Sequence, residues 1–244
     1  MPINLATRLD NCLLAGLPRK DRERLAGRCE RVDLVFGDVL CEAGKRFDHV
    51  HFPLSGSIAL MVALSERRLL EIGLIGSEGM LGATLALNVD STPMRGVVQG
   101  TGSTLRMPRD AFQREMEASK ALRTQLQRYL YVAMSQLARS TACTHFHETS
   151  PRLARWLLMS HDRARTDHFH LTHACLADML GVRRSSISVA AAAMRRASLI
   201  EYSRGEITVL DRPALERAAC PCYAADRADY ERQFAQVCTL AARR

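Results

Sequence analysis

Residues 171–210 read LTHACLADMLGVRRSSISVAAAAMRRASLIEYSRGEITVL, and their pattern predicts two short helices joined by a tight turn. Thr172 can cap the first helix, because a threonine hydroxyl accepts a hydrogen bond from a free amide of the first turn. Gly181 can end it, because glycine adopts a left-handed backbone conformation without steric cost. The second helix is expected from about residue 184 to 197. The positions at helical spacing that should be buried are Leu176, Met179, Leu180, Ile187, Ala191 and Met194.

A β-hairpin is predicted directly after the second helix. Residues 199–202 and 207–210 are short apolar runs, and Ser203-Arg204-Gly205-Glu206 between them contains the glycine that a tight turn favours. The whole stretch therefore predicts helix, turn, helix and hairpin in that order. This is the order of a winged helix-turn-helix, in which the hairpin forms the wing.

The charges of this unit favour DNA as its partner. Arg183 and Arg184 fall at the start of the second helix, where side chains enter the major groove first. Arg184 is expected to read a guanine, since its planar guanidinium can donate two hydrogen bonds to that base, and Arg204 on the wing is expected to reach a phosphate. The alternative is a small helical pair in a globular core, with its arginines on a solvated face. The full set of expected DNA contacts is Thr172, His173, Arg183, Arg184, Ser185, Ser186, Ser188, Val189 and Arg204.

The composition is that of an ordinary globular chain long enough for two domains. Of 244 residues, 47% are hydrophobic and 25% are charged, and the formal net charge of +8 suits an anionic partner such as double-stranded DNA. No run of about 18 apolar residues could span a bilayer. The first residues also lack the features of a secretory signal peptide. We therefore expect a cytoplasmic location and no membrane partner.

Residues 30–107 change from helical spacing to short alternating runs separated by turns with glycine. No helical crossover is expected between these runs, which favours an antiparallel roll. The predicted fold class is α+β, with an N-terminal antiparallel β-roll of the jelly-roll type, a long helix and a C-terminal winged helix-turn-helix. The expected strands are residues 31–36, 39–41, 49–52, 57–62, 69–75, 95–98 and 104–107.

A long helix is predicted from about residue 119, and it continues for about seven turns. Its apolar positions recur at spacings of three and four, and they form either a face buried in the chain's own core or a dimer interface. Thr149-Ser150-Pro151 then supplies a cap and an early proline for the next helix, so a hinge is expected at residues 146–150. The apolar positions of the long helix are Leu122, Leu126, Tyr129, Ala133 and Leu137.

Two parts of the chain resemble the Crp/Fnr family of bacterial transcription regulators. The first part is similar to the front of the family's cyclic-nucleotide-binding-like β-roll. Residues 171–210 resemble its DNA-binding domain over their whole length, above all in Leu176–Arg184, LADMLGVRR. Together the two resemblances cover nearly the entire chain in the family's order. The residues that carry the first one are Gly37, Leu40, Glu42, Gly44, Val50, Phe52, Gly56, Ser57 and Ile58.

The resemblance implies a homodimer on a palindromic operator. It identifies the long helix as the dimerisation helix, so Leu122, Leu126, Tyr129, Ala133 and Leu137 are expected at a dimer interface. It aligns Arg184 with a base-contacting arginine of the family, and it leaves RNA polymerase as a possible further partner. The implied domains are a sensor domain at 1–118, the dimerisation helix at 119–147, the DNA-binding domain at 148–222 and a helical tail at 223–244.

The phosphate-binding cassette of the cyclic-nucleotide-binding members is incomplete. In those members a Gly-Glu pair and a brief helix precede an arginine that is followed by serine or threonine. Here Glu78 is retained as a candidate ribose partner, and Arg95 is the candidate pocket arginine. Arg95 is followed by Gly96, however, so a hydroxyl to help hold the phosphate charge is missing. We expect no dependence on cyclic AMP and no cofactor, and the sequence identifies no effector.

The eight cysteines lack the dense framework of a small secreted domain, so we expect mostly free thiols and no metal site. Cys12, Cys29 and Cys41 are too widely separated for an iron–sulfur centre, and nothing suggests haem. Cys220-Pro221-Cys222, together with Cys238, leaves open a metal- or redox-responsive regulator as the alternative function.

His168, His170 and His173 are more typical of surface or capping residues than of metal ligands. The chain has no Walker loop, no Gly-x-Ser-x-Gly and no His-Glu-x-x-His, so no residue set can be given a catalytic role. We therefore expect a regulator and not an enzyme.

Overall fold

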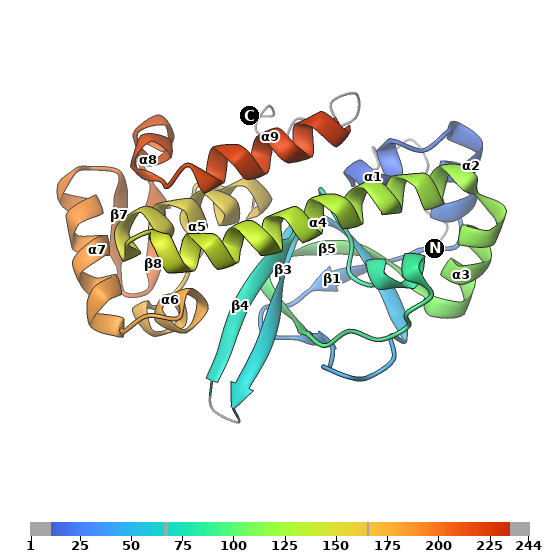
Figure 1. Ribbon diagram of the computed structural model, residues 1–244, viewed down its shortest axis with the longest axis horizontal. Coiled ribbons are helices and arrows are strands. Elements are labelled where there is room, and N and C mark those ends of the chain that lie inside the picture. Colours follow the sequence, from blue (N-terminus) through green and yellow to red (C-terminus); the bar gives the residue numbers. More distant parts are fainter. Residues whose placement is uncertain (1–10, 66–67, 165, 235–244) are drawn as a thin grey trace.

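The computed structural model describes residues 11–65, 68–164 and 166–234, and it joins a β-roll to a smaller helical domain (Figure 1). A long helix, α4 (Lys120–Phe146), crosses the molecule from the roll to the helical domain. The antiparallel roll, the long helix and the winged helix-turn-helix confirm the predicted α+β fold class. Within the described ranges, none of the helices combines the length and the apolar character that a membrane span requires.

The roll is one antiparallel sheet in the order β1-β5-β3-β4, with β2 paired to β5. Along each strand, side chains point alternately into the roll and away from it. Leu34, Ile58 and Val98 point inward and form part of its buried interior. Short helices precede and follow these strands in the sequence. The elements of this half are α1 (Cys12–Ala15), α2 (Arg19–Ala26), β1 (Glu30–Leu34), β2 (Val39–Cys41), β3 (His49–Ser65), β4 (Arg68–Ile75), η1 (Ala83–Leu87), β5 (Arg95–Pro108) and α3 (Arg109–Ala118).

Two pairs of expected strands are continuous in the structure. Residues 49–52 and 57–62 belong to one strand, β3, and residues 95–98 and 104–107 belong to β5. The register of the β3–β5 pair shifts three times between Pro53 and Ile58, so the expected turn is a set of β-bulges. Gly56 makes this possible, since its φ is +76° and a Cβ there would lie 2.4 Å from the carbonyl oxygen of Gly100.

Three of the five residues of α4 that are expected at a dimer interface are buried inside the chain itself, which corrects the expectation for those three. Leu122, Leu126 and Tyr129 belong to the same core as Phe52 and Met80 of the roll. Tyr129 reaches so close to Gly79 that a Cβ there would lie 2.3 Å from its hydroxyl oxygen. The other two expected interface residues, Ala133 and Leu137, are only half-buried.

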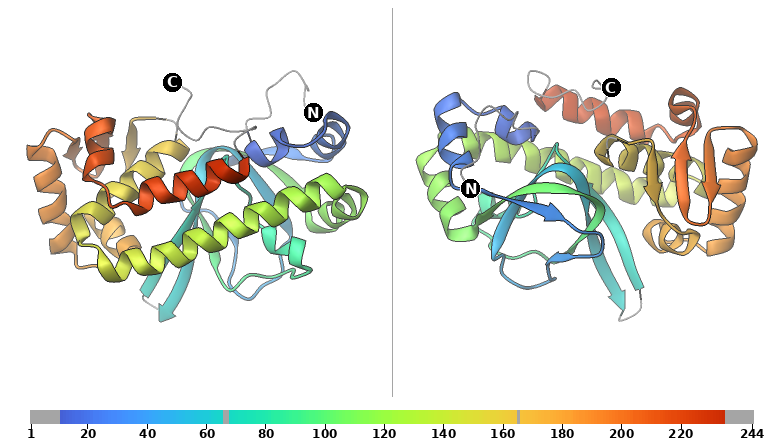
Figure 2. Two further views of the ribbon diagram at one scale, coloured as in Figure 1. Left: turned by 45° about the horizontal axis from the view of Figure 1, so that its top comes forward. Right: turned by 180° about the vertical axis from the view of Figure 1, so that it is seen from behind.

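The last described helix, α9 (Cys222–Phe234), runs back along α4 toward the N-terminal end of the roll (Figure 2). Its Tyr230 and Phe234 are buried in the N-terminal core. Arg139 of α4 binds both Asp226 and Asp229 of α9 at 2.6 Å, which fixes the two helices together. The buried side of α4 therefore has a partner that lies about one hundred residues later in the chain.

The helical domain has the predicted order of elements and one additional strand. β6 (His168–His170) pairs with β8 (Glu206–Val209), so the hairpin is part of a three-stranded sheet in the order β6-β8-β7. The remaining elements are α5 (Thr149–Ala164), α6 (His173–Leu180), α7 (Arg184–Arg196), β7 (Ile200–Ser203) and α8 (Arg212–Ala218). The hydrophobic core of this domain includes Leu176, Leu180, Ile187, Ala191 and Met194, as expected, while Met179 is only partly buried.

Candidate nucleic-acid interface

Local signals set the helix-turn-helix. The Thr172 side chain accepts a hydrogen bond from the Cys175 amide at the start of α6. Gly181 ends α6 with a φ of +64°, in the left-handed region that favours glycine. Ile187, Ala191 and Met194 hold α7 against the domain core, so the opposite face of α7 is set outward.

The outward face of α7 carries most of the residues expected to contact DNA. Arg183, Arg184 and Ser185 are exposed, and Val189, one helical turn after Ser185, is 70% exposed. Figure 1 shows α7 at the outer edge of the molecule, on the side away from the roll. Ser186 is half-buried. The structure thus leaves the start of α7 accessible at the outer edge of the molecule, as a recognition helix requires.

His173 and Ser188 are tied to each other. The His173 Nδ1 atom lies 3.0 Å from the Ser188 Oγ atom, and the Ser188 hydroxyl donates to the backbone carbonyl of Arg184 at 3.1 Å. The His173 ring also stacks on Tyr202 of the wing at 4.2 Å between ring centres. Burial, together with the positive charge of Arg184, lowers the pKa of His173. This contact ties α6, α7 and the wing to one another.

The wing ends in a two-residue turn. Arg204 and Gly205 both have positive φ, +52° and +87°, and Ser203 pairs with Glu206 across the turn. This is the geometry of a tight hairpin turn whose twist matches that of the strands. The Arg204 side chain is exposed at the tip.

His168 and His170, on the strand before α6, contact a glutamate of the neighbouring strand. His168 and His170 both contact the carboxylate of Glu206, at 2.8 and 2.7 Å. They therefore belong to the surface of the three-stranded sheet. The β6 strand that places them is too short to show a clear alternation in sequence.

The DNA-binding unit is docked on the roll through polar contacts that the sequence did not reveal. Trp156 of α5 donates a hydrogen bond to Glu71 of β4, and Gln99 of β5 donates to the sulfur of Met179 in α6 at 3.0 Å. Arg163 of α5 binds Glu78 at 2.7 Å, and both side chains are only 6% exposed.

The two candidate pocket residues lie in separate ion pairs. The Glu78 carboxylate is neutralised by Arg163, and it also accepts a hydrogen bond from the Gly76 amide. Arg95 lies 3.2 Å from Glu42 instead. The structure therefore does not bring Glu78 and Arg95 onto a shared partner.

Gly96, the residue after Arg95, has little space for a side chain. A Cβ at Gly96 would lie 2.9 Å from the sulfur of Cys41 and 3.3 Å from the Leu81 side chain. A serine or threonine, which the phosphate cassette has at this point, would require those side chains to shift.

Cys220 and Cys222 lie beside two further potential metal ligands that their position in the sequence does not reveal. Cys143 and His147 at the end of α4 lie beside them, although they are about 75 residues away in sequence. Hydrogen bonding by Cys220, with further contributions from His147 and Arg155, lowers the pKa of Cys143, while burial opposes the shift. Cys29, Cys41, Cys143, Cys175, Cys220 and Cys222 are free thiols, Cys12 is disulfide-bonded, and Cys238 lies outside the described residues.

Two family models match the chain. The cyclic nucleotide-binding domain matches residues 31–119, and the Crp-like helix-turn-helix domain matches residues 151–218. Among curated proteins, none matches the sequence.

Several solved structures are similar in fold. A transcriptional regulator of the crp/fnr family from Eubacterium rectale is 17% identical with a TM-score of 0.64, and the match covers 83% of this chain and 94% of the other. FixK2 from Bradyrhizobium japonicum is 12% identical with a TM-score of 0.64, over 79% and 98% of the two chains. The c-di-GMP responsive regulator CLP from Xanthomonas campestris is 13% identical with a TM-score of 0.63, over 80% and 100%. With its nucleotide-binding-type roll followed by a Crp-like helix-turn-helix, the chain belongs to the Crp/Fnr family of transcriptional regulators.

Proposed function

We propose that the protein is a homodimeric regulator that binds a palindromic DNA site through α7 and the wing, without cyclic AMP. The observation that carries this proposal is the set of unpaired arginines on the outer surface. Among the described residues, Arg183, Arg184 and Arg204 form no ion pair, whereas the half-buried Arg139 and the buried Arg155 are each paired with carboxylates. Free guanidinium groups on a convex helix and a wing tip suit phosphates and base edges.

The homodimer is supported by the face of α4 that the chain leaves uncovered. Exposed side chains recur along it at alternating spacings of three and four, which is the repeat by which two helices pack in parallel. Tyr131 is 57% exposed and Met134 is 68% exposed. The half-buried Ala133 and Leu137 lie at the edge of this face. The exposed positions are Tyr131, Met134, Ala138, Thr141 and His145.

Independence from cyclic AMP is supported by the two ion pairs and by Gly96. A bound cyclic nucleotide needs a free carboxylate for the ribose and an arginine with an adjacent hydroxyl for the phosphate. Here Glu78 is paired with Arg163, and a hydroxyl side chain after Arg95 would fit only if the side chains of Cys41 and Leu81 shifted. Accommodating the ligand would therefore require breaking a buried ion pair, which is strongly unfavourable.

The test is selection of bound duplexes from a randomised pool, with the full chain and no added nucleotide. We expect enrichment of a two-fold symmetric sequence with half-sites about one helical turn apart. The Arg114→Ala variant, altered at an exposed arginine of α3, should select the same sequence. Enrichment of no sequence above the starting pool would refute specific binding, and enrichment only after cyclic AMP is added would refute its independence.

A further inference from the structure

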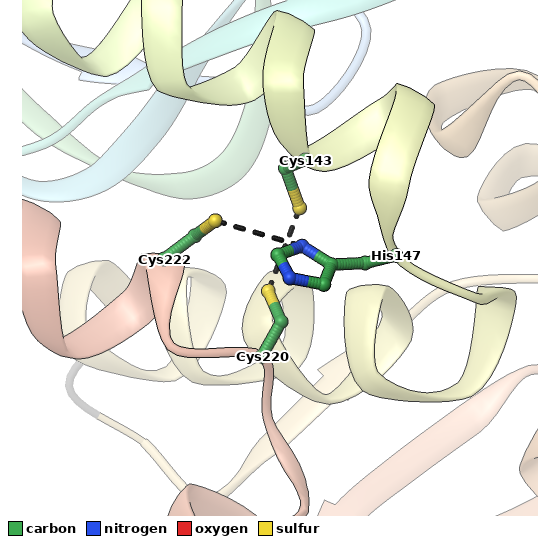
Figure 3. A group of neighbouring side chains, drawn as sticks. All are labelled: Cys143, His147, Cys220 and Cys222. Atoms are coloured by element: carbon green, nitrogen blue, oxygen red, sulfur yellow. Dashed lines mark hydrogen bonds between the residues drawn. The ribbon is translucent and has the colours of Figure 1, made fainter.

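Three cysteines and one histidine converge where the long helix ends (Figure 3). Cys143 lies in the last turn of α4, and His147 is the residue that caps it. Cys220 and Cys222 lie between α8 and the start of α9. The four potential ligand atoms all lie within 4.8 Å of one another.

The distances fit one tetrahedral ion. The sulfur atoms of Cys143 and Cys220 are 3.5 Å apart, and the Cys222 sulfur is 3.7 Å from Nδ1 of His147. Zn–S bonds of about 2.3 Å place the sulfurs of a tetrahedral site about 3.8 Å apart. These two separations differ from the tetrahedral value by only a few tenths of an ångström, and no two of the four ligand atoms are more than 4.8 Å apart.

The surroundings suit a site with a net negative charge. Three thiolates and a divalent cation carry one negative charge, and Arg155 lies against Cys143. Arg155 is itself held by Asp226 at 2.7 Å and by the hydroxyl of Ser140 at 3.1 Å. An arginine that is fixed by its own partners and lies beside a ligating thiolate can orient that ligand and balance its charge, as the groups around a metal's ligands commonly do.

The burial of the three cysteines, together with the half-buried His147, favours a site without an open coordination position. Cys143, Cys220 and Cys222 are at most 8% exposed. Cys220 also lines an open groove of about 510 Å³ between α8 and α9, which offers the ion a path from solvent. Four protein ligands leave no coordination position for a substrate, so the arrangement is that of a structural zinc site.

We infer that Cys143, His147, Cys220 and Cys222 bind one Zn²⁺ per chain. The ion ties the end of the long helix to the segment that follows the DNA-binding domain. Both ends of that domain are thus fixed at one point, because α5 begins at Thr149, directly after the histidine ligand. A disulfide between Cys143 and Cys220 is the competing use of these thiols, and it would leave the convergence of His147 and Cys222 unexplained.

The first measurement is the zinc content of the full chain purified in reducing buffer with zinc supplied during expression. We expect one zinc per chain in the wild type and in Cys175→Ser, a control that alters a free thiol outside the cluster. Cys222→Ser and Cys220→Ser should each lose most of the metal. Equal zinc content in Cys222→Ser and the wild type would overturn the proposal, as would a metal-free wild type.

The second measurement keeps the test decisive if a cysteine variant does not fold. Wild-type protein stripped with a chelator is titrated with Co²⁺, whose visible spectrum reports tetrahedral thiolate coordination. We expect saturation at one equivalent, displacement by Zn²⁺ and a higher Tm once zinc is returned. Weak, featureless Co²⁺ absorption, or an intact mass that shows a Cys143–Cys220 disulfide in reducing buffer, counts against the site. Neither measurement involves DNA, so this outcome is separate from that of the proposed function.

Discussion

The indole Nε1 of Trp156 donates a hydrogen bond to the Glu71 carboxylate at 2.9 Å, and this bond joins the DNA-binding domain to the β-roll. The second carboxylate oxygen of Glu71 is buried. Burial raises the pKa of Glu71 to about 7 from its ordinary 4.5, although Trp156 and the positive charge of Arg163 oppose the shift. The junction between the two domains therefore contains a carboxyl group that titrates near neutral pH.

The raised pKa predicts how stability depends on pH. The folded protein binds the Glu71 proton more tightly than the unfolded chain, so the free energy of unfolding should fall as pH rises from about 4.5 through about 7. The loss is at most roughly 3.4 kcal/mol. Glu71→Gln keeps the hydrogen bond from Trp156 and should remove this loss, which urea unfolding at pH 5 and pH 8 can measure. Glu117→Gln, at an exposed site on α3, is the control. A Glu71→Gln effect of equal size at both pH values would contradict the assignment.

Arg184→Ala should weaken binding to the selected duplex by about tenfold or more, because a two-fold contact to guanine contributes about 1–3 kcal/mol of discrimination. It should also relax the preference at one base pair of each half-site. Fluorescence anisotropy with specific and scrambled duplexes measures both effects. If affinity for the two duplexes falls equally, Arg184 contacts only phosphate.

Arg204→Ala should act differently, because the wing tip is placed to meet the backbone. We expect binding to all duplexes to weaken alike and the dependence on salt to become less steep, as for the loss of one phosphate contact. Titrations at two salt concentrations provide the measurement, with Arg114→Ala as the unaffected control. A selective loss for the specific duplex would instead make Arg204 a base-reading residue.

Met134→Arg should convert the dimer to a monomer at micromolar concentration, because it puts a charge in the middle of the uncovered face of α4. Leu87→Arg is the matched control, since Leu87 is 58% exposed on η1, outside that face. Sedimentation velocity gives the mass of each. A wild-type chain that sediments as a monomer with and without DNA would exclude the proposed dimer.

Cyclic AMP at millimolar concentration should not raise the Tm, since a ligand that binds the folded state must stabilise it. Thermal unfolding monitored by circular dichroism measures this directly. A saturable increase would show that the Glu78–Arg163 ion pair opens for the ligand.

The helix-turn-helix could be predicted from sequence because its signals are local. Thr172 and Gly181 act on the backbone within a few residues of themselves, and the two-residue turn at Arg204 depends on its neighbouring glycine. The apolar stripe on α4 predicts less about the fold. Its periodicity showed that one face is buried, but not that the roll and α9 cover it.

The contacts between distant segments could not be predicted, because no local signal in the sequence marks them. Cys143 and His147 give no signal by themselves, and their spacing becomes informative only when Cys220 and Cys222 are brought beside them. Glu78 was read by analogy as a ligand residue, whereas its partner Arg163 lies in a helix of the other domain. In each case the relevant neighbour is set by the packing of whole domains.

The return of α9 to the roll also bears on the order in which the protein is made. Tyr230 and Phe234 are buried in the N-terminal core, and the Tyr230 hydroxyl donates to the backbone carbonyl of Glu78 at 2.8 Å. Ribosomes release a chain from its N-terminus, and early domains generally fold first. Here the first domain leaves the ribosome with two aromatic side chains missing from its interior. That domain reaches its native packing only when the end of α9 has been synthesised, so a nascent chain arrested before Tyr230 exposes an apolar surface that chaperones can bind.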